Sequence, residues 1–157
     1  MVNSYCMNAI RIEISAPASL DRVWDAWTKS DQITKWFSPD ARVNAKVGGP
    51  FELFFDPRDH GHQCTKGCVF TLIEPQKELR FTWKGPDQFA ELMNKLASLT
   101  SVRVAFHSEK ESTRVVVEHS GWGEGEDWVQ ARDWHQHAWE EALECLKAFL
   151  ETGTSQL

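Results

Sequence analysis

The sequence has little that would suggest a membrane-bound, secreted or nucleic-acid-binding protein. No stretch of its 157 residues approaches the roughly 18 consecutive apolar residues of a membrane helix. Met1–Asn8 lacks the charged and apolar regions of a signal peptide, and four cysteines are too few for a disulfide framework. Lys and Arg total 17 against 23 Asp and Glu, so the net charge of −6 leaves no basic excess to attract a polyanion. We therefore predict a cytoplasmic protein with no membrane or nucleic-acid partner.

Motifs of covalent and cofactor chemistry are also absent. There is no Gly-x-Ser-x-Gly elbow, phosphate loop or dinucleotide fingerprint, and Gly48-Gly49 is a turn signal only. Ser120 follows His119 directly, and neighbouring residues of a strand point to opposite faces, so the two cannot form a catalytic dyad. Cys145 falls on the apolar side of a predicted helix and reads as core filler. These absences predict no cofactor and favour a role without catalysis.

What the chain does have is flat aromatic surface. It contains eight Trp and nine Phe but one Tyr, so its large rings carry few hydroxyl groups. Rings of this kind fill cores, and they also line pockets for apolar or aromatic ligands.

Hydrophobic periodicity predicts an α+β fold in a single domain over residues 1–157. Period-two alternation predicts strands, and apolar residues three or four apart predict helices. Ser19 is the expected N-cap of the first helix. The expected strands are residues 10–14, 41–45, 51–55, 68–73, 79–83, 102–107 and 115–119, and the expected helices are 20–27, 31–37 and 126–151. We expect a curved antiparallel sheet of about six or seven strands wrapped around the long C-terminal helix.

This element order resembles the helix-grip fold of the START-like (SRPBCC) superfamily. Short stretches spread over nearly the whole chain resemble the branch of heat shock protein 90 ATPase activator homologues: IEISAP (12–17), VWDAWT (23–28), ITKWF (33–37), VGGPF (47–51), LRFTW (79–83), TRV (113–115), HSGW (119–122) and WEEAL (139–143). The resemblance implies a fold with a cavity between sheet and helix, but such folds host many functions. Residues 87–98 look like a helical insertion, and residues 123–133 are longer than the family pattern; both lie where a cavity mouth is expected.

A cluster of metal-ligand residue types occurs within nine residues: His60, His62, Cys64 and Cys68. Structural zinc sites usually take ligand pairs from two separate segments, and this spacing matches no established zinc motif. We predict a polar hairpin tip with Cys68 packed in a strand and no structural metal, with metal binding as the alternative.

The other histidines differ in their predicted surroundings. His119 shares the inward parity of the preceding valines, so it is either a satisfied core histidine or a polar anchor for a ligand. His135 and His137 face different ways on their helix, and His137 is expected to pair with Glu140 or Glu141 at the surface. Glu52 and Glu118 have outward parity and are expected to be solvated.

The inward-facing residues form one candidate ligand-binding surface. It comprises Trp36, Phe37, Phe51, Phe70, Phe81, Trp83, Val104, Phe106, Val117, His119, Trp134 and Trp139. Large rings on a curved sheet facing one helix rarely pack without leaving space, so we favour binding of a small apolar or aromatic molecule. We expect a flat apolar molecule with one polar group to be preferred over a charged metabolite, with His119 supplying the hydrogen bond.

Two other functions stay open. One is a cavity enzyme of the polyketide cyclase or dehydratase type, for which His119 is the clearest acid or base. The other, implied by the resemblance, is a module that binds the chaperone ATPase, although we recognise no second domain for the chaperone. A monomer or a homodimer is expected.

Overall fold

A computed structural model describes residues 8–157, and it confirms the predicted α+β class. Cys6 and most of the N-terminal segment examined for a signal peptide lie outside the described residues. The strands are β1 (Ile10–Ala16), β2 (Asp40–Val43), β3 (Phe51–Phe54), β4 (Phe70–Glu74), β5 (Glu78–Trp83), β6 (Thr100–Ser108) and β7 (Thr113–Ser120). The helices are α2 (Leu20–Thr28), α3 (Ser30–Ile33), α4 (Ala90–Met93) and α5 (Glu126–Thr152), with 3-10 turns at Asp87–Phe89 and Leu96–Ser98.

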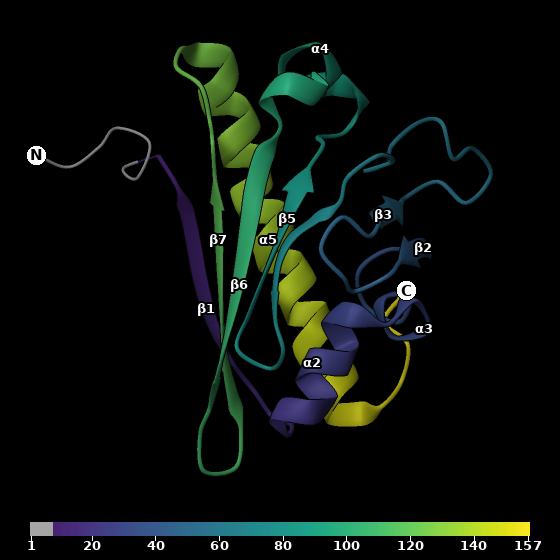
Figure 1. The fold of residues 1–157 in the computed structure, drawn as a ribbon, viewed down its shortest axis with the longest axis vertical. Helices are drawn as coiled ribbons and strands as arrows, with labels where there is room; N and C mark the ends of the chain where they lie inside the picture. The colour runs from purple at the N-terminus through teal and green to yellow at the C-terminus, as the bar shows by residue number, and fades with distance from the viewer. Residues whose placement is uncertain (1–7) are drawn as a thin grey trace, which may run out of the picture.

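The seven strands form two antiparallel sheets. The larger sheet has the order β1-β7-β6-β5-β4, and β2 pairs with β3 in a separate two-stranded sheet. The small sheet joins the edge of the large one through backbone bonds from Phe51 to Cys68 and between Gly49 and Phe70, each 2.9 Å long. β4 begins at Phe70, two residues later than the sequence predicts, and its pairing with β5 has a register shift between Phe70 and Leu72. The smaller sheet therefore lies next to the β4 edge of the large sheet, on the side of β5 and α3 (Figure 1).

The long helix α5 runs along one face of the large sheet (Figure 1). Its buried residues recur at helical spacing and close the core from that side: Ala131, His135, Trp139, Leu143, Leu146, Phe149 and Leu150. Helix α2 packs beside the C-terminal half of α5, where the rings of Trp27 and Trp139 stack 6.4 Å apart. The N-cap is the predicted one, because the Ser19 hydroxyl accepts a hydrogen bond from the Arg22 N–H.

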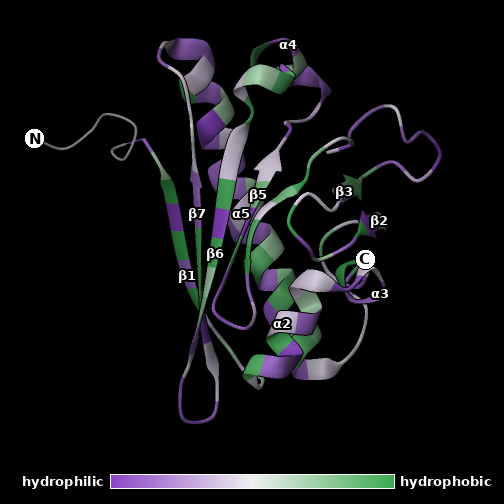
Figure 2. Ribbon diagram, in the orientation of Figure 1, coloured by the Kyte–Doolittle hydropathy of each residue, from purple (hydrophilic) through white to green (hydrophobic). Residues whose placement is uncertain are grey.

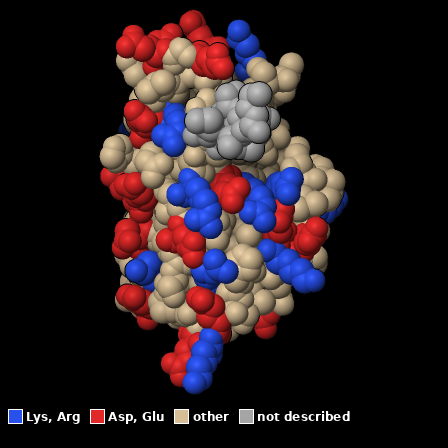
Figure 3. Space-filling view, turned by 90° about the vertical axis from the view of Figure 1, so that its left-hand side faces the viewer, with Lys and Arg blue, Asp and Glu red and all other residues tan. Residues whose placement is uncertain are grey.

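The other face of the large sheet is covered by ion pairs. Along β1, hydrophilic and hydrophobic residues alternate as predicted (Figure 2). Across the strands Arg11 and Arg103 both reach Glu118, at 3.8 and 3.3 Å, while Arg114 pairs with Glu13 at 3.1 Å. Charges of both signs are therefore interleaved on this side of the molecule, as Figure 3 shows.

Three local predictions were wrong. Helix α3 ends at Ile33, so Trp36 and Phe37 lie in the turn after it, held by backbone bonds to the Ile33 carbonyl. Glu52 is buried and not solvated, because its carboxylate accepts the Gly67 N–H at 2.8 Å and pairs with Arg42 at 3.4 Å. Val129, an apolar residue near the start of the predicted helix 126–151 that we expected on its buried side, is 55% exposed.

Among the described residues no helix combines the length and the apolar character needed to cross a bilayer. The predicted helical insertion at residues 87–98 is present as α4 with its two 3-10 turns. It covers the end of the sheet near the start of α5 (Figure 1).

Candidate ligand-binding pocket

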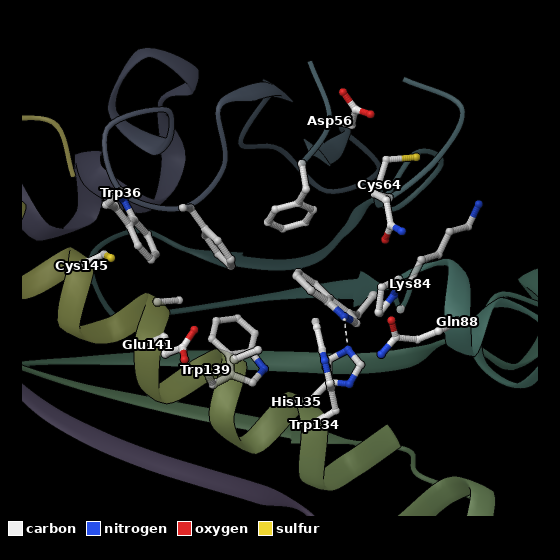
Figure 4. A pocket seen from close by; sticks show the side chains of 18 of the residues that line it. Trp36, Asp56, Cys64, Lys84, Gln88, Trp134, His135, Trp139, Glu141 and Cys145 are labelled. Carbon is white, nitrogen blue, oxygen red and sulfur yellow. Dashed lines mark hydrogen bonds between the residues drawn. The ribbon is translucent and has the colours of Figure 1, made fainter. Parts of the chain in front are cut away.

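A pocket of about 480 Å³ opens between α5 and the loops that face this helix. Aromatic rings from four separate segments line it: Trp36, Phe37, Phe55, Trp83, Trp134 and Trp139. Figure 4 shows α5 below the space, carrying Trp134 and Trp139, with Trp36, Asp56 and Cys64 above it. Phe55 and Trp134 are 42% and 41% exposed, so both rings stand at the mouth.

Helix α5 forms the floor of the pocket because of the spacing of its side chains. Trp134, Ala138, Ala142 and Cys145 lie three or four residues apart and share one face. The two alanines are small, and the space above them is not filled by their own helix. A wall of tryptophan and phenylalanine thus faces a floor with room for a flat ligand.

His135 is part of the pocket wall, and the sequence analysis did not anticipate its burial. The Trp83 indole N–H donates to His135 Nε2 at 3.1 Å, and His135 Nδ1 lies 2.7 Å from the Ala131 carbonyl oxygen. Because Nε2 accepts, the proton is assigned to Nδ1, which donates to that carbonyl. Burial lowers the pKa of His135 to about 4, so the ring is neutral at pH 7.

His119 is the polar partner of the other central tryptophan. The Trp139 indole N–H donates to His119 Nδ1 at 3.0 Å, so Nε2 carries the proton and donates to the Thr100 hydroxyl at 2.8 Å. Burial, reinforced by the nearby His135 ring, holds the pKa of His119 well below its usual range. His119 is fully buried behind Trp139 and does not line the pocket, and both of its nitrogens are engaged by protein groups.

The twelve predicted site residues divide into two groups. Five line the pocket: Trp36, Phe37, Trp83, Trp134 and Trp139. Seven are packed in the core behind it: Phe51, Phe70, Phe81, Val104, Phe106, Val117 and His119. The rings of Phe51 and Phe81, for example, stack 3.8 Å apart and leave no space between them.

The polar residues of the lining were missed by the sequence analysis. They are Asp56, Gln63, Cys64, Lys84, Gln88 and Glu141. Most lie in loops without periodicity, so no pattern marked them as inward-facing. Figure 4 shows Lys84 and Gln88 at one end of the pocket and Glu141 at the other, near Trp36 and Cys145.

The two histidines among the four metal-ligand candidates take separate partners. His60 stacks on Phe54 with ring centroids 4.0 Å apart, and its Nε2 lies 2.8 Å from Asp40. His62 pairs with Asp87 at 2.8 Å, while Cys68 is buried beside β4. Within residues 8–157 no group of three or more His, Cys, Asp or Glu side chains is arranged to hold a metal. His137 pairs with Glu140 at 3.7 Å, as predicted.

Solved structures share the fold at low sequence identity. DynU16, a protein of the dynemicin biosynthetic locus, aligns with a TM-score of 0.72 and 20% identity over 94% of this chain and 49% of its own. The Aha1 dimer from Colwellia psychrerythraea gives 0.70 and 23% over 92% and 97%, and PFC0360w, an HSP90 activator from Plasmodium falciparum, gives 0.71 and 21% over 91% and 96%. This chain thus spans about half the length of DynU16 and nearly all of the other two. At these identities the likeness shows the fold alone.

Sequence comparison identifies the family. No curated protein sequence matches the chain. The family model described as Activator of Hsp90 ATPase homolog 1-like protein matches residues 17–151, which include α2, α3, α4, all of α5 but its last residue, and all described strands but β1. The resemblance drawn from short stretches is thereby confirmed over most of the sequence. The chain belongs to the family of Activator of Hsp90 ATPase homolog 1-like proteins.

Proposed function

We propose that this protein binds a small apolar or aromatic molecule in the pocket above α5. The observation that carries the proposal is a space of about 480 Å³ walled by six aromatic rings, two of them partly exposed at the mouth. A flat ligand there would remove ring surface from water, which contributes roughly 25 cal/mol for each Å² of apolar surface buried.

The experiment is a titration with a neutral aromatic probe, N-phenyl-1-naphthylamine, whose emission rises in apolar surroundings. We expect saturable binding to the wild type and loss of binding, by about tenfold or more, in Ala142→Trp, whose indole would fill the floor of the pocket. Val129→Trp is the matched control, since Val129 is exposed on the same helix away from the pocket. Equal binding by all three proteins, or none by the wild type up to the solubility limit, would refute the proposal.

A chaperone-directed role is the second candidate, and it rests on the family description and on the HSP90 activator among the structural neighbours. It is tested by adding the protein to an Hsp90 ATPase assay. Stimulation that is unchanged in Ala142→Trp would place this activity outside the pocket. Whether the chain acts as a monomer or a homodimer stays a prediction, which sedimentation would test.

A cavity enzyme has less support. The buried histidines are neutral, and each ring nitrogen is engaged by a protein group, so neither is free to accept or donate a substrate proton. The remaining ionisable groups of the lining are Asp56 and Glu141 on opposite sides of the space, together with Cys64, Cys145 and Lys84. Turnover of a polyketide-like substrate that is lost in Glu141→Gln would support this alternative.

A further inference from the structure

A second, more open hollow of about 740 Å³ adjoins the aromatic pocket. Cys64 and Lys84 line both spaces, so the two meet at these residues. The residues around the second hollow include the polar side chains of His62, Lys66 and Asn94. A ligand seated among the rings can therefore extend a polar substituent past Lys84 without meeting the apolar core.

The carboxylates around this junction are engaged by other groups. Asp56 pairs with Arg58 at 3.3 Å, and its pKa is lowered mainly by a hydrogen bond from the Arg58 N–H. Asp87 binds His62 at 2.8 Å and accepts the Gln63 N–H at 3.0 Å. Glu52 is held by Arg42 and by the Gly67 N–H. Each of these carboxylates thus has hydrogen-bond or ion-pair partners of its own.

Lys84 has no ion-pair partner among the residues that the structure describes. No carboxylate within residues 8–157 lies within 4.0 Å of its ammonium group, and the side chain is half-buried. It follows Trp83 directly at the end of β5, which fixes its position beside the pocket wall. A Cβ atom at Gly67 would lie 3.5 Å from the Lys84 Nζ, so the ammonium group rests against the backbone that borders the second hollow.

We propose that the ligand is an aromatic molecule carrying an anionic group, with its rings in the aromatic pocket and the anion bound by Lys84 at the junction. This proposal rests on the proposed function and names the chemical class of its ligand. It replaces His119, whose nitrogens are already engaged, as the polar anchor, and it reverses the expectation that an uncharged ligand is preferred over a charged one. A half-buried ammonium ion without a carboxylate partner forms charge-assisted hydrogen bonds to a carboxylate or sulfonate, which are stronger than those between neutral groups.

Two other charges near the pocket do not offer the same anchor. Lys66 is exposed and lines the second hollow only, so it is too far from the rings to orient them. Glu141 lies at the opposite end of the aromatic pocket, where it would repel an anion bound the wrong way round (Figure 4). The charges at the two ends of the pocket therefore favour one orientation of an anionic ligand, with its anion at Lys84.

The test compares two probes that share one aromatic frame, 1-anilinonaphthalene-8-sulfonate and the neutral N-phenyl-1-naphthylamine. We expect the wild type to bind the sulfonate more tightly, and Lys84→Met to weaken sulfonate binding by about tenfold while leaving binding of the neutral probe within about twofold. Lys66→Met is the matched control and should change neither affinity. Lys84→Gln tests the same expectation if Lys84→Met lowers the melting temperature.

The outcomes separate the two proposals. If the neutral probe fails to bind the wild type, the proposed function is wrong. If the neutral probe binds, and Ala142→Trp blocks it, but Lys84→Met and Lys84→Gln leave sulfonate affinity unchanged, the pocket stands and the anionic ligand class is overturned. An equal loss of sulfonate affinity in Lys66→Met would also overturn it, because the effect would then be one of general surface charge.

Discussion

Two buried histidines of this protein act as hydrogen-bond acceptors for tryptophan. An indole N–H can only donate, and burying it without an acceptor is costly. A neutral imidazole supplies one acceptor nitrogen and can return its own N–H to a nearby oxygen, as His119 does with Thr100 and His135 with Ala131. Trp83 and Trp139 can therefore be buried beside the pocket with their polar atoms satisfied.

Stability should fall as the pH drops below the pKa that these histidines have in the unfolded chain. Their folded pKa is lowered, so the unfolded state binds protons first, and free energy of unfolding is lost from about pH 6.5 down to the folded pKa. His135 alone, with a folded pKa of about 4, should remove about 2 kcal/mol between pH 7.5 and 5. His62 opposes the loss, since its exposed pair with Asp87 raises its pKa.

Urea denaturation at pH 7.5 and 5 measures this loss, and His135→Gln should flatten the dependence. The lowered pKa values of Glu13, Asp56, Glu78 and Asp87 place their titration below this window, so these four carboxylates contribute little to it. Equal free energies of unfolding at the two pH values would show that the histidines are not buried in the neutral form.

Replacing Trp139 by Phe should destabilise the protein by about 1–3 kcal/mol, because His119 Nδ1 would be left buried without a donor. Trp139→Ala, which also opens a cavity under the sheet, should cost about 3–5 kcal/mol. Trp134→Phe is the matched control, since that ring is 41% exposed and its change should lie within about 0.5 kcal/mol. Thermal unfolding of the three variants measures the differences in stability. An unchanged stability of Trp139→Phe would contradict the assigned hydrogen bond between Trp139 and His119.

At the scale of elements, the insertion over residues 87–98 is fixed to the end of β5. The Asn94 side chain accepts the Gly85 N–H at 2.8 Å and donates to the Gly85 carbonyl at 3.0 Å. Met93 is fully buried, and its sulfur would lie only 2.6 Å from a Cβ at position 85, so any larger residue there would force Met93 to shift. The ring of Phe89 contacts Trp134 of α5, with centroids 6.0 Å apart, so the insertion also forms part of the pocket rim.

Asn94→Ala should loosen this insertion without unfolding the sheet. Both hydrogen bonds to Gly85 would be lost, and we expect faster amide hydrogen exchange in residues 86–98 and a stability loss of about 1–3 kcal/mol. Gln88→Ala serves as the control, because Gln88 is exposed in the same segment. Exchange that stays at the wild-type rate in Asn94→Ala would mean that packing of Met93 alone holds the insertion.

At the scale of the whole molecule, we expect the natively purified protein to carry no stoichiometric metal. The two histidines among the four candidate ligands between residues 60 and 68 have separate partners, Asp40 for His60 and Asp87 for His62. Elemental analysis measures the metal content directly. One zinc per chain that is lost on changing Cys64 and Cys68 together would show the prediction to be wrong.

Short-range pattern was enough to predict the fold. Alternation in β1, β6 and β7, the Ser19 cap and the long apolar stripe of α5 are properties of neighbouring residues, because side-chain direction repeats every two residues in a strand and every 3.6 in a helix. The same periodicity failed at Glu52. The prediction that Glu52 points outward used the alternation within one strand. In the fold, the backbone N–H of Gly67, from a distant loop, donates a hydrogen bond to the Glu52 carboxylate.

The candidate site depended more on the tertiary structure. From the sequence one can tell that many rings gather between sheet and helix, since their parity is local, and five of the twelve predicted residues do line the pocket. Which rings pack against each other and which face open space depends on distances between elements that no periodicity encodes. Only the tertiary structure showed that His119 is used internally and that Lys84 lies at the junction of two hollows without a carboxylate partner. Residues that are far apart in sequence become hydrogen-bond and ion-pair partners only when the chain is folded, so local sequence patterns do not identify these partners.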